Sequence, residues 1–434
     1  MLAILITLDC VRADILEEGS GLTPNLDALG PEWTTFTQAF AQSQNTLSSH
    51  LTMLTSNYLF QHGVYSNFSQ KALPDHALPK RLHGLGWDCR AFTSVDFLAL
   101  LLGNQVGLPD PRFPPSENRS IAARLARHFF GQRSRAGMTL DRGMKWLKSA
   151  KRKKDAFLWM HCFDAHMAYE APATFLQQHV RAAYFVPDTL RQQIRDRGWF
   201  SPDFAEYEWK VPLEHFPQRY RAAVAYQDDC LGAFIAGLKK AGLWSDALVI
   251  VTADHGECLM GDHSVYCAHK KLFDTTIRVP LRVKFPQGHL AGEQVDALVQ
   301  HVDLAPTVAA LAGFEEPLYM GHDLAPVAGG QHPGHAVAFS EHVDNFMRAV
   351  RDREHIFVEQ VPGAQNKWGL AMEEGSLFRR DGTPTPDAEP VHAPGLRSAM
   401  EAILSSGAEA RAAWGGEQAA DEETSRRLRE LGYL

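Results

Sequence analysis

The sequence predicts an α/β protein with a mostly parallel central sheet and helices on both faces, followed by a smaller C-terminal subdomain with a short antiparallel sheet. Over the first two thirds of the 434 residues, short apolar or β-branched runs alternate with longer stretches of helical spacing. Beyond about residue 327 the connections become rich in Gly, Pro and Ala, and two further strand-like runs follow. We therefore expect a main domain over residues 1–327 and a C-terminal subdomain over residues 328–434.

The strands of the main domain are predicted from short apolar or β-branched runs, which are typical of strands in a mostly parallel sheet. These runs are Leu2–Leu8, Arg90–Val95, Ala156–Cys162, Ala247–Thr252 and Pro280–Phe285. Between them, apolar residues at helical spacing predict helices over Met138–Lys148 and, more strongly, over Tyr220–Leu238, with Gly242 near the C-terminal stop of the second.

In the C-terminal subdomain, strand-like runs cover Ala336–Glu341 and Arg348–Glu359. A polar turn at Asp352-Arg353 breaks the second run, which favours an antiparallel pairing of its two halves. Residues 112–135 and 360–395 show no clear periodicity and are predicted to be loops.

Composition and charge exclude several classes of protein. With 43 basic and 51 acidic side chains the formal net charge is -8, so no overall positive field would hold a nucleic acid. The mean hydropathy is -0.24, and no apolar run reaches the roughly 18 to 20 residues that span a bilayer. The apolar start MLAILITL lacks the basic region and cleavage site of a signal peptide. Because the six cysteines are also scattered without a pairing pattern, we expect a cytoplasmic protein with no membrane partner.

Acidic and imidazole side chains follow three of the predicted strands. Asp9 follows the first run, Asp164 and His166 follow Ala156–Cys162, and Asp254-His255 follows Ala247–Thr252. A single Asp in such a place is usually a helix cap. Because ligands bind outside the carboxyl ends of parallel strands, three such endings instead predict a site for one or two divalent ions. Imidazole among the ligands favours Mn or Zn, with Mg, Fe or Ca as alternatives.

The segment Gln44–Ser56 places hydroxyl groups where a helix begins. Thr46 precedes two serines and His50, and an apolar helical run follows. Free N–H groups at a helix N-terminus can bind an anion, so Thr46 could lie beside an anionic substrate. Taken alone, the segment fits equally a helix that Thr46 or Ser48 simply caps.

Taken together, these segments resemble the sulfatase family of the alkaline-phosphatase superfamily. The matching stretches, in the family's order, are LITLDCVRAD, TPNLDAL, TLSSHLTMLTS with the following QHGV, MHCFDAHMAYEAP, VTADHGE, LFDTTIRVPL, HVDLAPTVAALAG and the terminal LRELGYL. The resemblance runs through most of the chain, and it implies the fold of this family and a metal-dependent ester hydrolase over residues 1–327.

The resemblance also implies roles for individual residues. Asp9, Asp254 and His255 fall on the family's metal ligands, and Thr46 falls on its nucleophile and would also contact the metal. His166 falls on a histidine that contacts the transferred group. His269 lies near a Lys or His that binds the same group or the leaving oxygen, with His263 as its rival, and Asp164 is a candidate ligand of a second metal. Glu257, at the end of VTADHGE, is expected to be solvated or to cap a helix.

Two departures from the family pattern bear on the substrate. Arylsulfatases carry a Cys or Ser in CxPSR that is matured to formylglycine, whereas this chain has Thr46-Leu47-Ser48-Ser49-His50, and Thr46 cannot follow that route. Cys10 replaces a second acidic residue often found after the first Asp, which suggests a metal other than Ca²⁺. We expect Cys10 to contribute its backbone rather than a thiolate, while Cys10 and His50 both remain candidates for contact with a second metal or with substrate.

The expected function is therefore hydrolysis of phosphate esters through a covalent threonine intermediate. Phosphodiesters or phosphonate monoesters are favoured over simple monoesters, because no evident basic cluster would neutralise a dianion. Three alternatives stay open: a sulfate-ester hydrolase that uses unmodified Thr46, a phosphoryl transferase, and a non-catalytic binding relative. The expected partner is a small anionic ester, and the chain could form a homo-oligomer.

Overall fold

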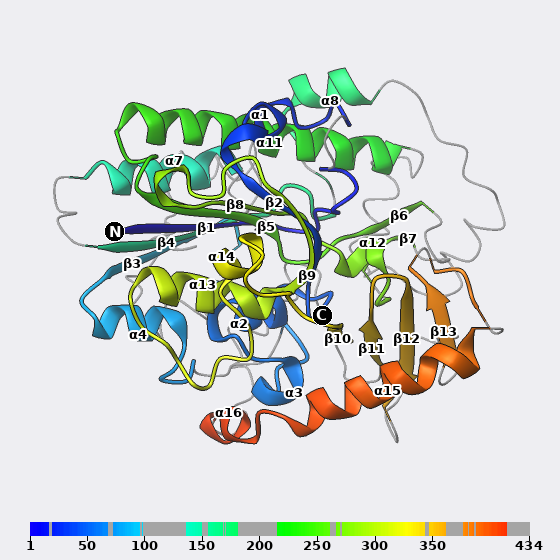
Figure 1. Cartoon of the computed structure of the whole chain (residues 1–434). Helices are drawn as coiled ribbons and strands as arrows, with labels where there is room; N and C mark the ends of the chain where they lie inside the picture. The colour runs from blue at the N-terminus through cyan, green and yellow to red at the C-terminus, as the bar shows by residue number, and fades with distance from the viewer. Residues whose placement is uncertain are drawn as a thin grey trace, which may run out of the picture.

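A computed structural model of the chain describes the two sheets and the helices around them (Figure 1). The described residues are 1–16, 20–67, 73–95, 98, 136–149, 155–167, 169, 171–180, 215–260, 266–269, 271–342, 347–361, 376–380, 382–385 and 388–414. The predicted loop 112–135 and the candidate residue His263 lie outside them.

The central sheet has seven strands in the order β3-β4-β1-β5-β8-β2-β9. Their bounds are β1 Leu2–Leu8, β2 Thr34–Phe40, β3 Asp88–Thr93, β4 Ala156–Cys162, β5 Ala247–Ala253, β8 Leu281–Lys284 and β9 Gln294–Gln300. β1 runs parallel to both neighbours, and its last residue, Leu8, pairs with Cys162 of β4 and with Ala253 of β5. The carboxyl ends of these three strands therefore lie level with one another.

The predicted strands of the main domain are confirmed, with small differences at their ends, and the mostly parallel sheet is confirmed with them. β8 is antiparallel to both β5 and β2. Two strands of this sheet were not predicted from the sequence, β2 and β9. Both mix polar with apolar residues, which is a weaker signal than the apolar runs of β1, β4 and β5.

Helices cover both faces of the central sheet (Figure 1). One face carries α1 (Pro24–Ala28), α7 (Ala136–Leu147), α8 (Ala173–His179) and α11 (Phe216–Lys240), and the other carries α2 (Thr46–Thr55), α4 (Leu78–Gly84), α13 (Leu304–Leu311) and α14 (Leu324–Ala328). The two predicted helices correspond to α7 and α11. α11 ends two residues before Gly242, which adopts a φ of 66°. At this left-handed φ a glycine is favoured, which explains why it marks the stop.

The C-terminal region forms a separate antiparallel sheet, as predicted. Its strands are β10 (Ala338–Glu341), β11 (Met347–Arg351), β12 (His355–Gln360) and β13 (Ser376–Arg379), in that order, followed by α15 (Glu389–Ser405) and α16 (Ala408–Ala413). The predicted turn at Asp352-Arg353 separates β11 from β12. The prediction of a loop over 360–395 is wrong at β13 and at the start of α15. β13 is too short to show a period, and Pro394 inside α15 conceals its helical pattern.

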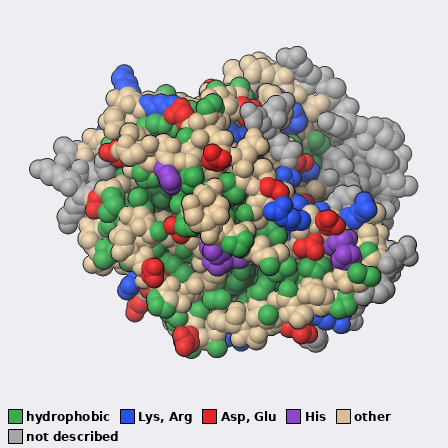
Figure 2. Space-filling view, in the orientation of Figure 1, with side chains coloured by type: hydrophobic (Ala, Val, Ile, Leu, Met, Phe, Trp, Pro, Cys, Tyr) green, Lys and Arg blue, Asp and Glu red, His purple; other side chains and the backbone are tan. Residues whose placement is uncertain are grey.

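The chain also forms a hairpin, β6 (Cys258–Met260) and β7 (Tyr266–Ala268), and two short helices, α3 (Leu59–His62) and α12 (Asp274–Ile277). Among the described residues, no helix combines the length and the apolar character needed to cross a membrane. On the face shown in Figure 2, the described acidic and basic side chains are scattered rather than gathered into one field of a single sign.

Candidate active site

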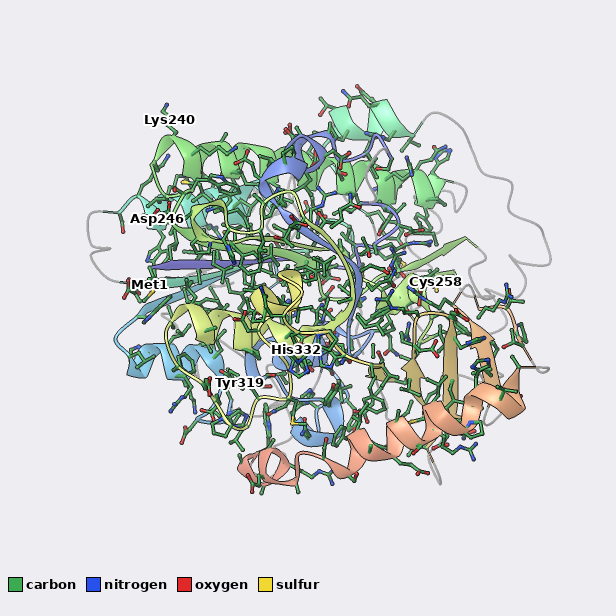
Figure 3. The ribbon with its side chains drawn as sticks, in the orientation of Figure 1. Met1, Lys240, Asp246, Cys258, Tyr319 and His332 are labelled. Atoms are coloured by element: carbon green, nitrogen blue, oxygen red, sulfur yellow. The ribbon has the colours of Figure 1, made fainter. Side chains whose placement is uncertain are left out.

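The strand ends of the central sheet bring the predicted metal ligands together. Asp9 follows β1, and its N–H donates to Cys162 O at the end of β4 (2.8 Å); Asp254 follows β5, and its N–H donates to Leu8 O (3.3 Å). Figure 3 shows the direction of the strands: Met1 and Asp246, which precede β1 and β5, lie at one side of the sheet, and Cys258 lies at the other, beside α12. The carboxylates of Asp9 and Asp254 therefore share one edge.

We name Asp9, Cys10, Asp254 and His255 the strand-end cluster. One ligand atom each from Asp9, Asp254 and His255 lies within 4.8 Å of the others, and all three side chains are fully buried. Asp254 Oδ1 accepts from the N–H groups of Cys10 (3.1 Å) and His255 (2.8 Å). Asp254 Oδ2 and His255 Nε2, in contrast, make no hydrogen bond with any described residue. Buried polar atoms are rarely left without a partner, so these two atoms fit a bound cation.

The electrostatics of the strand-end cluster also favour a bound cation. Burial raises the pKa of the Asp254 carboxyl above its ordinary value, and the negative charge of Asp9 raises it further. Two carboxylates that converge without solvent repel each other, and a divalent cation between them would remove that cost. The mixture of carboxylate oxygen and imidazole nitrogen suits Zn, Mn or Fe better than Ca.

Cys10 occupies a strained position in the cluster. Its φ is 60°, in the left-handed region that non-glycine residues seldom adopt. Its N–H donates to Asp254, and its carbonyl accepts from the hydroxyl of Tyr220 on α11 (2.9 Å). The Cys10 thiol donates to Asp9 Oδ1 (3.0 Å), and burial together with the Asp9 charge raises its pKa well above the usual range. The surrounding structure thus holds both the backbone and the side chain of Cys10 in place.

Two predicted histidines, His166 and His269, lie beside the strand-end cluster. The His166 ring stacks on Phe163 with 4.3 Å between ring centroids, and its Nδ1 lies 2.8 Å from Met167 O. The His269 ring centroid lies 4.5 Å from that of His255 and 5.8 Å from that of His166. The structure therefore brings both together with the predicted metal ligands.

Glu257 was expected to be solvated or to cap a helix, and the structure instead buries it. It is 1% exposed, and its Oε1 lies 3.8 Å from His269 Nδ1. The sequence position, directly after the strand end, indicates the neighbourhood of the cluster but not the burial.

Thr46 is the first residue of α2, and it does not cap the helix. Asn45 is the N-cap, and its Oδ1 accepts from Ser48 N (3.4 Å). Thr46 Oγ1 makes no hydrogen bond with any described residue, which leaves this hydroxyl available for chemistry. The expectation that N–H groups of the first turn bind an anion needs correction, because Asn67 Oδ1 takes the Leu47 N–H (2.9 Å) and Asn45 takes that of Ser48.

A series of buried polar contacts joins Thr46 to Asp9. The Thr46 carbonyl accepts from His50 Nδ1 (2.7 Å), and His50 Nε2 lies 2.9 Å from Thr7 Oγ1. Thr7 Oγ1 lies 3.0 Å from His161 Nδ1, and His161 Nε2 lies 3.0 Å from Asp9 Oδ2. Burial lowers the pKa of His50 to about 3 and that of His161 to about 4. This connection fixes the orientation of a predicted metal ligand relative to the predicted nucleophile.

The sequence did not indicate that Thr7 and His161 belong to this series of contacts. Both lie inside apolar strand runs, so the strand pattern masks them, although His161 belongs to the segment MHCFDAH that was singled out for His166. His50 was a candidate contact to a second metal or to substrate. In the structure both of its ring nitrogens already have protein partners.

Asp164 was a candidate ligand of a second metal. Its Oδ2 accepts from Ala136 N at the start of α7 (2.9 Å), and it belongs to none of the groups of converging ligand atoms among the described residues. Its role toward a metal stays a prediction, and His263 lies outside the described residues.

Comparison with known proteins places the chain in a family. The model of the family described as Sulfatase matches residues 2–314. YidJ, an uncharacterized sulfatase of Escherichia coli strain K12, is 29% identical over 188 residues, which cover 41% of this chain and 36% of YidJ. PehA of Trinickia caryophylli, described as a multifunctional alkaline phosphatase superfamily protein, is 36% identical over 104 residues, which cover 23% of this chain and 19% of PehA. The matches thus span about a third or less of these curated relatives.

A solved structure supports the fold over nearly the whole chain. The phosphonate monoester hydrolase of Agrobacterium radiobacter superposes with a TM-score of 0.69 at 20% identity, and the match covers 92% of this chain and 95% of that one. At this identity the likeness establishes the fold alone.

Proposed function

This chain belongs to the sulfatase family of the alkaline-phosphatase superfamily, and from that premise we propose that it is a metal-dependent hydrolase of phosphate esters. Its substrates are small anionic phosphodiesters or phosphonate monoesters, and Thr46 is the nucleophile. Arg12, the arginine of LDCVRAD, supports the preference for a singly charged ester. Its guanidinium makes two short contacts with Asp14 (2.9 and 2.7 Å). Because Asp14 already balances the charge of Arg12, this arginine would not neutralise the second charge of a dianionic ester.

The observation that carries this proposal is the hydroxyl of Thr46. It stands at the first residue of α2, Asn45 does the capping, and no described residue binds Thr46 Oγ1. A threonine cannot mature to formylglycine, so its own oxygen must attack the ester. A free threonine hydroxyl is a poor nucleophile and needs activation.

The residues of the strand-end cluster fit a divalent ion through Asp9, Asp254 and His255. When bound, the ion supplies Lewis-acid activation of the nucleophile and of the substrate oxygen. Asp9 is oriented by His161, which in turn is tied through Thr7 and His50 to the carbonyl of Thr46. These contacts therefore hold Thr46 and the metal ligands in one fixed arrangement before the substrate binds.

This arrangement gives Thr46, His166 and His269 separate roles in the proposed reaction. Thr46 Oγ1 attacks phosphorus in line and loses its hydroxyl proton to solvent, and the P–O bond to one leaving alcohol breaks. The Thr46 ester that forms keeps the other substituent of the phosphodiester or phosphonate. His166 stabilises charge on the non-bridging oxygens, and His269, whose ring faces those of His166 and His255, protonates the leaving oxygen. Water then attacks phosphorus and releases Thr46.

Sulfate-ester hydrolysis is the second candidate. The observation that favours it is the family itself, since YidJ is described as a sulfatase and the Sulfatase model matches residues 2–314. The same residues would then act on a sulfuryl group, again through unmodified Thr46.

The test compares four aryl substrates, a phosphodiester, a phosphonate monoester, a phosphate monoester and a sulfate ester, on Mn²⁺- and Zn²⁺-loaded protein. We expect the first two to be fastest and Thr46→Ala to lower their kcat by at least about 1,000-fold, as for loss of a nucleophile. An acid quench during turnover should trap the remaining phosphoryl ester or phosphonyl group on the peptide that contains Thr46.

Thr55→Ala is the matched control, because Thr55 is a buried threonine of the same helix whose hydroxyl donates to Leu51 O (2.7 Å). It should keep full activity. Faster turnover of the sulfate ester would favour the second candidate, and activity that survives in Thr46→Ala would exclude Thr46 as the nucleophile.

A further inference from the structure

Cys10 has a strained backbone, is buried and lies close to the predicted metal ligands. Neither packing nor helix capping explains this combination. It is fully buried, and its φ of 60° costs free energy that the contacts with Asp254 and Tyr220 must offset. A glycine, or an asparagine, would adopt this backbone conformation more readily. The Cys10 side chain, for its part, lies against a predicted metal ligand through the hydrogen bond from its thiol to Asp9 Oδ1.

The sulfur of Cys10 points into the strand-end cluster. Cys10 Sγ forms one group of converging ligand atoms with His255 and His269, and another with Asp9 and His166, each within 4.8 Å. Independently of the cysteine, Asp254 Oδ2 and His255 Nε2 are buried in the same place without a hydrogen bond to any described residue. These two atoms fit a bound cation, and Cys10 Sγ shares groups of converging ligand atoms with two of the three predicted metal ligands, His255 and Asp9.

In contrast to the expectation from the sequence that Cys10 contributes only its backbone, we propose that Cys10 Sγ is a direct ligand of the divalent ion held by Asp9, Asp254 and His255. The site is then a mixed oxygen, nitrogen and sulfur site that prefers Zn²⁺ or Co²⁺ to Mg²⁺ and Ca²⁺. The inference rests on the metal dependence of the proposed function. Thiolate sulfur is a soft ligand that Zn²⁺ accepts readily, whereas Mg²⁺ and Ca²⁺ bind oxygen almost exclusively.

Binding of the ion in this way replaces one interaction of the thiol by another. The S–H bond breaks, its proton passes to solvent, and the sulfur lone pair forms the bond to the ion. The hydrogen bond from the thiol to Asp9 Oδ1 is lost, which frees that oxygen to face the ion. Two carboxylates and one thiolate around a dication leave a net charge of -1, which neighbouring imidazole donors and backbone N–H groups can stabilise.

The test adds Co²⁺ alone to the metal-free full-length protein and to the variants Thr46→Ala and Cys10→Ser. Bound Co²⁺ with a thiolate ligand gives a charge-transfer absorption in the near ultraviolet. We expect this band in the wild type and in Thr46→Ala, and we expect Cys10→Ser to bind Co²⁺ without it. Cys10→Ser should also lose about 100-fold or more in Zn²⁺ affinity, at least as much as the loss of an outer-shell partner, with a smaller change for Mn²⁺.

Co²⁺ binding to the wild type without the band would overturn the proposal. X-ray absorption of the Zn²⁺-loaded wild type gives a second reading that needs no variant: a sulfur neighbour at about 2.3 Å supports it, and a shell of oxygen and nitrogen only contradicts it. The result for Cys10 as a ligand can be distinguished from the result for the proposed function. A band that persists in an inactive Thr46→Ala protein leaves Cys10 as a ligand, whereas ester turnover without the band leaves the function and removes Cys10.

Discussion

Two groups of charged side chains meet at α12, and they differ in whether their carboxylates are paired with permanent cations. One is the strand-end cluster. The other, which we name the arginine clamp, consists of Asp274, Arg351 and Arg380 and joins α12 to the C-terminal sheet. α12 touches both groups, since Asp274 is its first residue and the backbone of its Thr276 accepts from Gly256 N, directly after His255 (2.8 Å).

In the arginine clamp both carboxylate oxygens have cationic partners. Asp274 Oδ1 accepts from Arg351 Nη1 (2.9 Å), and Oδ2 accepts from Arg380 Nη2 (2.6 Å). Both guanidinium groups also lie over the ring of Phe40, at 5.1 and 5.3 Å from its centroid. The protein itself completes the charge balance, so the clamp needs no ligand and acts as a structural joint.

Among the described residues, the strand-end cluster has no permanent cation: Asp9 Oδ2 lies 3.0 Å from His161 Nε2, and Asp254 Oδ2 lies 3.5 Å from His255 Nε2. Asp9 has contacts with His161 and Cys10, but Asp254 Oδ2 and His255 Nε2 have no hydrogen bond among the described residues. The difference teaches that burial of charge alone does not identify a functional site. The informative feature is a buried carboxylate and imidazole that converge and stay unsatisfied.

The largest expected effect comes from Asp254→Asn, which keeps the shape of the side chain and its acceptor for the two backbone N–H groups but removes its charge. We expect more than about 100-fold loss in Zn²⁺ affinity and in phosphodiester turnover. The metal-free variant should nevertheless be more stable than metal-free wild type, by about 1 kcal/mol, because the repulsion between Asp254 and Asp9 is gone.

Isothermal titration with Zn²⁺ and thermal unfolding with and without EDTA measure the two effects. Asp228→Asn serves as the control, because Asp228 also accepts several N–H groups, those of Asn25 and Leu26, at a site away from the cluster. If metal-free Asp254→Asn were less stable than the wild type, the cluster would not be under electrostatic strain, and the contrast with the clamp would fail.

The next largest effect is expected when a substitution breaks the arginine clamp. Arg351→Ala removes a fully buried cation and leaves Asp274 with Arg380 alone, so unfolding free energy should fall by about 3 kcal/mol. Zn²⁺ affinity of the folded protein should change little, since no arginine of the clamp contacts a cluster residue among the described contacts. Urea unfolding and Zn²⁺ titration on the same preparation distinguish the two quantities.

Arg353→Ala is the matched surface control, because its pair with Asp296 is more than half exposed on both sides and should contribute little to stability. Loss of Zn²⁺ binding in folded Arg351→Ala would show that the clamp and the cluster are coupled through α12 and are not two separate devices.

The sequence predicted what depends on local pattern. The apolar runs of Leu2–Leu8 and Ala247–Thr252 identified strands, and the acids that follow them, Asp9 and Asp254, could be assigned to one edge because parallel strands end together. The antiparallel direction of β8 could not be predicted, since it depends on how the chain crosses the sheet rather than on residue type. The polar mixtures of β2 and β9 concealed two strands in the same way.

Long-range partners explain what the sequence could not show at the site. The Leu47 N–H, predicted to be free for an anion, is taken by Asn67, twenty residues further along the chain. His161 reads as one polar residue within the run AFLWMHC, and its contact with Asp9 depends on the neighbouring positions of β1 and β4. The division of the chain at residues 327 and 328 stays a prediction.

The smallest expected effect concerns another buried carboxylate, Asp303, which like Asp274 is paired, but with a titratable partner. Asp303 Oδ1 lies 2.8 Å from His335 Nε2. Burial acts to lower the pKa of His335, but the Asp303 charge and this hydrogen bond outweigh it, so the pKa lies above its ordinary value of about 6.5. The neighbouring His322 ring, 4.6 Å away between centroids, has a lowered pKa because of burial and then because of His335.

The sign of the pH effect follows from these directions. A raised histidine pKa means that the folded state holds the proton more tightly, so the stabilisation is complete below about pH 6.5 and is lost as pH rises through the folded pKa. His335→Gln keeps a donor to Asp303 but cannot titrate. The difference in urea midpoint between wild type and His335→Gln should therefore be largest near pH 6 and shrink toward pH 9, with a total on the order of 1 kcal/mol. His332→Gln, which changes a neighbouring ring without touching Asp303, should show no such trend. A constant difference across this range would mean that Asp303 is satisfied by its backbone donors alone, and that the charge of its partner, unlike the charges in the clamp, contributes nothing.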